Sequence, residues 1–355
     1  MGRPRSLLRT RPQGIDRRTF FRRMSAGTVS HRRHPMVAIR DGHEITNDTH
    51  ALGAQNHTDA TEGSYAARVS AGLKACHEWM PIRVTDPTDL RKNNRSFAIE
   101  DLVDLIMLEE RLTARSRQAT PGTHFTQTGA FADPARTLPG AEQESWLANK
   151  LRTSTARWKL VGQGVMFAQF KSVPGLLAAG GGAFFNAGQW DGYRPARDRV
   201  HAVLKGGDGF APVNDTVILT GDIHSSWAAD LAQDPNNPDT TAGGCDPATG
   251  TASNAVEFVG TSVTSPGGSD PNGTVAARIR LRNPHFRYVE LTRRGYMLLD
   301  VDRDRVNGEW WYVDRVDAPS DAQAFGTAWQ VAHGTNRLAA GTRTTPKANP
   351  PALAP

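Results

Sequence analysis

Two polar segments of this sequence each follow an apolar run and carry side chains that could do chemistry. In the first, Met36–Ile39 precedes Arg40-Asp41-Gly42-His43-Glu44-Ile45-Thr46-Asn47. In the second, Thr216–Thr220 precedes Gly221-Asp222-Ile223-His224. Carboxylate and imidazole groups this close together are typical ligands of a metal that takes both oxygen and nitrogen donors. The two segments are therefore the candidates for a metal-dependent site.

The second segment gives the sharper geometric expectation. In an extended backbone, residues two positions apart project to the same side, so Asp222 and His224 would converge on one point. The alternative is that Asp222 caps a helix and His224 is an ordinary polar residue. For the first segment, the alternative is an exposed turn, which Asp41-Gly42 favours by itself.

The elements that would position these segments are both helices and strands. Apolar residues with helical spacing predict helices at 64–80, 98–117 and 141–159. Short apolar and β-branched runs predict strands at 36–39, 161–170, 216–220, 256–259, 288–291, 296–301 and 309–313. Helices mixed with strands in this order favour a layered α/β fold.

Composition excludes several classes of protein. The chain has 355 residues, 38% of them hydrophobic, and two cysteines, Cys76 and Cys245, which we expect to be unpaired. No apolar run approaches the ~20 residues that cross a bilayer, so no membrane span is expected. Residues 1–34 hold ten arginines and one acid, which leaves 32 basic and 35 acidic residues in the rest of the chain. Because the body is slightly acidic, no nucleic-acid partner is expected.

The basic head contains a possible export signal. Asp16-Arg17-Arg18-Thr19-Phe20-Phe21-Arg22 resembles a twin-arginine motif, although such a motif needs an apolar segment of ~7–15 residues behind it. The residues that follow, 24–34, are not apolar enough. The alternative is an arginine-rich tail that resembles a signal by chance.

From about 31 to 337, the chain resembles the alkaline phosphatase D family, the PhoD-like branch of the metallophosphatases. The matching segments occur in order: Asp41–Asn47, which corresponds to the family's WDDHE-type loop, Glu78–Arg83, Met107–Arg111, Val165–Phe167, Trp190–Tyr193, Gly221–His224, Glu257–Ser262, Asn283–His285 and Arg294–Tyr296. The twin-arginine resemblance agrees, since the family is typically exported by that route to the periplasm or the exterior.

The resemblance implies a four-layer fold, with two β-sheets packed face to face and helices outside. It implies hydrolysis of phosphate monoesters and diesters by a metal-activated water, at a cluster that can hold iron and calcium. His43 would protonate the leaving group and Glu44 would orient it. The metal ligands would be Asp41, Asp222 and His224. Asn47 and His285 would contact substrate, and we expect a monomer.

Two departures from the family pattern shape the expected activity. The family loop has Trp and two adjacent acids where this chain has Arg40-Asp41-Gly42, and Gly42 has no side chain to bind metal. The family's early Cys-containing and Gly-Asp-Tyr motifs are also absent before Met36. We therefore expect an incomplete metallophosphatase domain at 35–342, between the basic head 1–34 and a disordered tail 343–355. Weak metal binding and impaired phosphatase activity would follow, and the alternative is a catalytically inactive phosphate-binding or interaction domain.

Overall fold

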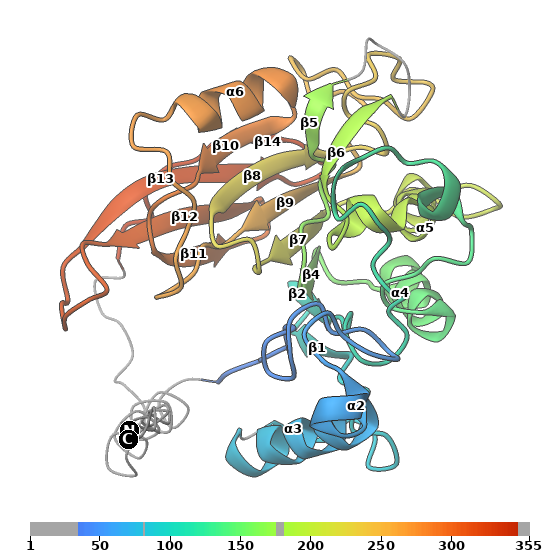
Figure 1. Cartoon of the computed structure of the whole chain (residues 1–355). Helices are drawn as coiled ribbons and strands as arrows, with labels where there is room; N and C mark the ends of the chain where they lie inside the picture. Colours follow the sequence, from blue (N-terminus) through green and yellow to red (C-terminus); the bar gives the residue numbers. More distant parts are fainter. Residues whose placement is uncertain (1–34, 81, 175–180, 347–355) are drawn as a thin grey trace, which may run out of the picture. The chain divides into compact units, whose positions relative to one another are not determined.

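The computed structural model describes residues 35–80, 82–174 and 181–346 (Figure 1). The chain divides into two units, one made of Met1–Ala38 with Pro346–Pro355 and the other of Ile39–Thr345. The predicted basic head, its twin-arginine-like motif and tail residues 347–355 lie outside the described residues. All the helices and strands given below belong to Ile39–Thr345.

The largest sheet has seven strands, and its centre is parallel. Its order is β1 (Arg95–Ile99), β2 (Val103–Met107), β4 (Trp158–Gln163), β7 (Thr216–Thr220), β9 (Ala255–Val259), β8 (Ser226–Leu231) and β10 (Phe286–Glu290). Strands β2, β4, β7 and β9 pair in parallel, whereas β1, β8 and β10 pair antiparallel at the two sides. The carboxyl ends of the four parallel strands therefore share one edge of the sheet.

Two smaller sheets are antiparallel. One contains β11 (Gly295–Val301), β12 (Arg305–Val313), β13 (Gln323–Ala332) and β14 (Leu338–Ala340). The other contains β3 (Thr123–Phe125), β6 (Gly182–Asn186) and β5 (Lys171–Pro174).

The four-stranded sheet packs face to face with the seven-stranded sheet (Figure 1). Trp158 and Phe258 of the larger sheet meet Trp310 and Tyr312 of β12 in a shared buried core. The Trp310 indole donates from Nε1 to the backbone oxygen of Val259 at 2.8 Å. Apolar area on both inner faces is thus removed from water, which is what holds two sheets together.

Helices cover the opposite face of the seven-stranded sheet. They are α4 (Ala141–Thr153) and α5 (Arg194–Lys205), whose buried residues include Leu147, Leu151, Val200 and Leu204. The other helices are α2 (Asp59–Glu62), α3 (Tyr65–Trp79), α6 (Thr274–Arg282) and the 3₁₀ turns η1 (Gly129–Ala132) and η2 (Trp190–Tyr193). The predicted α/β class and the sandwich of sheets with helices are confirmed. No described helix is both long enough and apolar enough to cross a bilayer.

Two predicted elements are wrong, and two others run too far: the helix predicted for 141–159 ends at Thr153, and the strand predicted for 161–170 is observed as Trp158–Gln163. Residues 98–117, predicted as a helix, instead supply the end of β1, all of β2 and a loop. Residues 36–39, predicted as a buried strand, belong to no strand, and Met36 is 50% exposed. A short apolar run does not reveal which partner will bury it, and pairing in a sheet decides the outcome.

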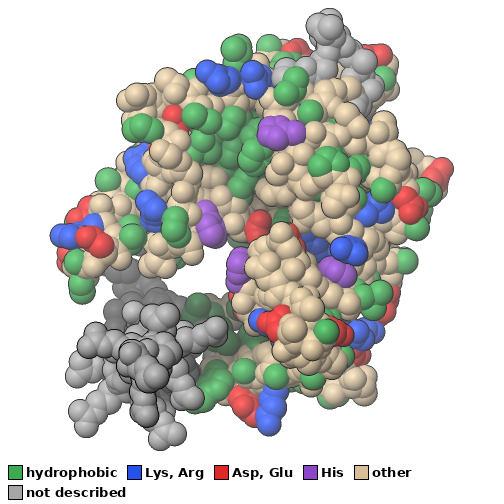
Figure 2. All heavy atoms as spheres, in the orientation of Figure 1, with side chains coloured by type: hydrophobic (Ala, Val, Ile, Leu, Met, Phe, Trp, Pro, Cys, Tyr) green, Lys and Arg blue, Asp and Glu red, His purple; other side chains and the backbone are tan. Residues whose placement is uncertain are grey.

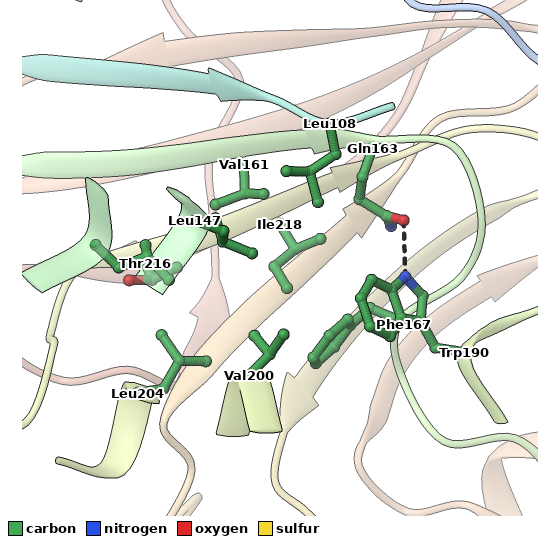
Figure 3. A pocket seen from close by; sticks show the side chains of 11 residues that line it. Leu108, Leu147, Val161, Gln163, Phe167, Trp190, Val200, Leu204, Thr216 and Ile218 are labelled. Atoms are coloured by element: carbon green, nitrogen blue, oxygen red, sulfur yellow. Dashed lines mark hydrogen bonds between the residues drawn. The ribbon is translucent and has the colours of Figure 1, made fainter. Parts of the chain in front are cut away.

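A small cavity remains between the helices and the sheet (Figure 3). Its volume is about 10 Å³, the size of a single water, and its lining is almost wholly apolar. The one amide there, Gln163, is satisfied because its Oε1 accepts from Trp190 Nε1 at 3.0 Å. The cavity is therefore a packing defect of the core rather than a ligand site.

Candidate active site

The parallel strands bring three loops to one edge of the sheet. Met107 of β2 pairs with Gly162 of β4, which in turn pairs with Leu219 of β7. The residues that follow these strands therefore emerge side by side. Ligand sites in open α/β sheets lie outside such carboxyl ends, so this edge is the natural place for a site.

The two polar segments singled out in the sequence meet at this edge, and an arginine joins them. Arg111, in the loop after β2, donates from Nη2 to Asp222 Oδ1 at 2.9 Å. The same nitrogen donates to Asp41 Oδ1. The side chain of Arg111 is 5% exposed, against 38% for Asp41 and 27% for Asp222. A buried guanidinium thus holds two partly exposed carboxylates together.

Glu109 fixes the loop that carries Arg111. Its carboxylate accepts from the backbone nitrogens of Arg111, Leu112 and Thr113 at 2.9–3.0 Å and from the Thr113 hydroxyl at 2.7 Å. Gln143 of α4 binds the backbone of Glu109. Its Oε1 accepts from Glu109 N at 2.8 Å, and its Nε2 donates to Glu109 O at 2.6 Å. Arg111 is therefore held by backbone contacts as well as by its own ion pairs.

A third carboxyl group, that of Glu110, lies behind the guanidinium. Its Oε2 accepts from Gly164 N at 2.9 Å, directly after β4. Its Oε1 has no hydrogen-bond partner among the described residues, although Glu110 is only 3% exposed. Burial raises the pKa of Glu110 to about 7, so near neutral pH its carboxyl group exists in both protonation states.

The electrostatics of the junction follow from its burial and its charges. Burial raises the pKa of the Asp222 carboxyl group, Arg111 opposes this shift, and the neighbouring Asp41 carboxylate adds to it. Burial lowers the pKa of Arg111, but Asp41 and Asp222 outweigh that effect and raise it overall. On the face drawn in Figure 2, acidic, basic and histidine side chains gather near the centre.

The backbone after β7 is not extended as expected. Asp222 and His224 have φ angles of +65° and +55°, in the left-handed region that Asp and His tolerate better than most residues. His224 Nδ1 lies 3.0 Å from the backbone oxygen of Pro266 in a hydrogen bond. The turn therefore sends the imidazole to another loop, and His224 does not join the two aspartates.

The loop that contains His43 is a tight turn. Backbone nitrogens of Ile45 and Thr46 donate to Gly42 O at 3.0 and 2.9 Å, and His43 and Glu44 are exposed. The Glu44 carboxylate accepts from Asp41 N at 3.0 Å. Glu44 therefore stabilises the turn beside Asp41. Among the described residues it makes no hydrogen bond to His43, the residue it is predicted to orient.

Asn47 and His285, the two residues predicted to contact substrate, both have hydrogen-bond partners within the protein. Asn47 donates its side-chain amide to Gln55 Oε1. His285 is fully buried, its Nε2 lies 2.8 Å from Gln169 O, and its ring is 4.4 Å from that of Phe286. Burial lowers the pKa of His285 to about 3, so the imidazole stays neutral. His285 is therefore a buried, neutral residue of the core.

Arg111 is the residue that the sequence analysis left without a role. The signal was present, because Glu109-Glu110-Arg111 directly follows the apolar residues Leu105 to Leu108. Charges at the end of a buried strand indicate a site, whereas the same charges inside a helix indicate a solvated face. The helix predicted for 98–117 concealed this difference.

The residues present do not fit a resident metal ion. The point between Asp41 and Asp222, where a cation would bind, is filled by the Arg111 guanidinium. Within the described part of the chain, no group of three or more His, Cys, Asp and Glu side chains could hold a metal. Calcium and catalytic zinc sites take more protein ligands than the two carboxylates that meet here.

Comparison with known proteins identifies the family of the chain. The family model for PhoD-like phosphatases matches residues 22–310. Alkaline phosphatase D of Bacillus subtilis (strain 168) is 29% identical over 297 residues, which is 83% of this chain and 47% of that protein. A solved structure titled "Structure of PhoD" is similar with a TM-score of 0.71 at 26% identity, over 87% of this chain and 55% of the other. The chain thus spans about half the length of the relatives it matches.

Proposed function

The chain belongs to the PhoD-like phosphatase family, and from this we propose that it is a phosphoric ester hydrolase of the alkaline phosphatase D type. The observation that carries the proposal is the meeting of Asp41 and Asp222 at Arg111. The two loops come from segments far apart in the chain and converge at the carboxyl edge of the parallel strands. That edge is where open α/β folds place their chemistry.

The chain's own residues supply the groups that hydrolysis needs. The oxygen of water forms the new bond to phosphorus, and the ester P–O bond breaks. Asp222 takes the proton of that water, and because burial raises the pKa of its carboxyl group, its carboxylate is a stronger base than an exposed aspartate. His43, exposed two residues beyond Asp41, gives a proton to the leaving oxygen.

The charge of the site predicts slow turnover. Two ionised carboxylates and one guanidinium leave a net negative charge where a phosphate ester must bind. An anionic substrate is repelled by such a site unless further positive charge is supplied. Members of the family are metal-dependent, and iron and calcium are the ions that the resemblance implies. We propose both as the ions to add in the assay.

A second candidate is a catalytically inactive domain that keeps the fold. The observation that favours it is that Arg111 fills the place of a cation between the two aspartates. Such a domain would still bind phosphate or another partner. It would turn over no ester under any metal condition.

The proposal is tested with 4-nitrophenyl phosphate and bis(4-nitrophenyl) phosphate as substrates for a monoesterase and a diesterase. The purified chain is assayed in EDTA and with added calcium or iron. We expect slow release of nitrophenol that falls at least tenfold in Asp222→Asn and Asp41→Asn. Asp321→Asn, a change at an exposed loop residue, serves as the control and should leave the rate unchanged.

Two results would change the assignment. Turnover that survives in both Asp41→Asn and Asp222→Asn would place the reaction elsewhere. No turnover under any condition would favour the inactive domain, and phosphate binding by calorimetry would then test its remaining role.

The same preparation tests the proposed monomer by its mass in solution. We propose export by the twin-arginine route, and N-terminal sequencing of protein recovered outside the cytoplasm tests it.

A further inference from the structure

The guanidinium of Arg111 occupies the position that a metal ion would need. A cation between two carboxylates must lie within bonding distance of an oxygen from each, and Arg111 Nη2 does so. The side chain is 5% exposed, so bulk water does not separate these charges. The attraction between this buried guanidinium and the two partly exposed carboxylates is screened less than that of a fully exposed pair.

Two glycines lie beside the Arg111 guanidinium. A Cβ atom on Gly42 would lie 3.8 Å from Arg111 Nη1, and one on Gly164 would lie 4.0 Å from Arg111 Nε. Both distances are ordinary van der Waals contacts, so alanine would fit at either position without displacing the guanidinium.

The backbone that carries Arg111 is fixed by hydrogen bonds. Glu109 holds the backbone nitrogens of Arg111 and of the two following residues, and Gln143 fixes Glu109 from α4. The Glu110 carboxyl group adds a third acidic group behind the guanidinium, with one oxygen unpaired among the described residues. Separating the pairs would leave the buried guanidinium without its two carboxylate partners, which is costly for a buried charge.

We propose that Arg111 is a built-in cation that holds Asp41 and Asp222 together in place of a resident metal ion. The chain then folds without metal, and an ion binds between the aspartates only when the guanidinium has been removed. This inference concerns metal binding alone, so it stands or falls independently of phosphoesterase activity.

The test compares metal binding by the wild type with that of Arg111→Met, which keeps an unbranched side chain and removes the charge. Calcium and manganese are titrated separately by calorimetry. We expect Arg111→Met to bind at least tenfold more tightly than the wild type. The gain should disappear in the double variant Arg111→Met/Asp222→Asn, because only one of the two aspartate carboxylates then remains.

Arg287→Met is the matched control. Arg287 pairs with Asp230, whose side chain is 1% exposed, so the change frees a single buried carboxylate. We expect no gain in metal binding there. An equal gain in Arg287→Met, or no gain in Arg111→Met, would contradict the proposal.

A measurement on the wild type keeps the test decisive if Arg111→Met does not fold. The melting temperature is compared in EDTA and in excess calcium or manganese, since a ligand that binds only the folded state raises it. We expect no difference. A metal-dependent rise that is lost in Asp222→Asn would show that metal enters beside an intact Arg111, and it would overturn the proposal.

Discussion

Arg111 Nη2 lies 2.9 Å from Asp222 Oδ1, although the two residues are 111 positions apart in the chain. The pair connects the loop after β2 to the loop after β7, two strands that are not neighbours in the sheet. Arg111 is buried, whereas Asp222 is only partly buried. The positive charge of Arg111 therefore needs the Asp222 carboxylate to offset the cost of its burial.

Asp222→Asn should therefore lower the free energy of unfolding by about 1.5–3 kcal/mol, the usual range for a lost hydrogen bond to a charged group. Asparagine tolerates the left-handed φ of +65° as well as aspartate does, so the backbone should not change. Urea denaturation measures the effect. Asp321→Asn, in an exposed loop, should stay within about 0.5 kcal/mol of the wild type. Equal stability of the two variants would show that the pair contributes nothing.

Glu109→Gln tests whether the loop after β2 is held by one carboxylate. Glutamine has a single side-chain oxygen and an amide nitrogen, so some of the four donors now bound by Glu109 would face another donor. We expect a loss of about 1–3 kcal/mol in unfolding free energy. Faster amide hydrogen exchange at 111–113 should accompany it. Glu142→Gln on the exposed side of α4 is the control, and similar exchange in both variants would contradict the role of Glu109.

Much of the fold could be predicted because its signals are local. The helix at 64–80 is observed as Tyr65–Trp79, with Ser64 capping it by accepting from Ala67 N at 3.2 Å. The strand at 216–220 is observed with the same bounds, since its β-branched and apolar residues suit a strand with both faces buried. These segments carry their own start and stop signals.

The site was only partly predictable, because its geometry depends on contacts between distant segments. Asp41 and Asp222 were identified from the polar residues that follow apolar runs, and they do meet. The φ of +55° at His224 and the burial of His285 come from turns and packing that residue types do not specify. The role of Arg111 became apparent only once β2 was known to be a strand.

Glu257 gives the protein a stability that falls as pH rises. Its carboxyl group is fully buried on β9 and accepts from the backbone nitrogens of Phe167 and Ala168, both at 2.8 Å. Burial raises its pKa from 4.5 to about 7, so the folded state binds this proton more tightly than the unfolded state. Between these two pH values the unfolded state alone is ionised. The free energy of unfolding should then fall by up to about 1.4 kcal/mol for each pH unit.

Glu257→Gln removes that titration. We measure its unfolding free energy by urea denaturation from pH 5 to pH 8. The slope of that free energy with pH should be smaller than in the wild type, by the equivalent of up to one bound proton. The variant will be less stable at low pH, because an amide cannot reproduce all the hydrogen bonds that Glu257 accepts. Glu100→Gln, at an exposed position, should follow the wild-type profile. Parallel profiles for Glu257→Gln and the wild type would show that Glu257 is ionised throughout.

A small cavity lies between α4, α5 and the sheet (Figure 3). Thr216 lines it and is 2% exposed, and its hydroxyl has no hydrogen-bond partner among the described residues. A buried hydroxyl without a partner has lost its hydrogen bonds to water and gained none in the protein. Thr216→Val, which keeps the same shape and removes the hydroxyl, should therefore stabilise the protein by about 1 kcal/mol. Thr220→Val, on the same strand, is the matched control.

The hydroxyl of Thr220 donates to Glu257 and accepts from Gln163 Nε2, so its removal leaves two buried groups unsatisfied. We expect Thr220→Val to lower the unfolding free energy by about 1–3 kcal/mol, the opposite sign for the same chemical change. Urea denaturation of both variants at one pH decides the matter. A loss of stability in Thr216→Val as large as that in Thr220→Val would mean that the Thr216 hydroxyl is satisfied in the folded protein.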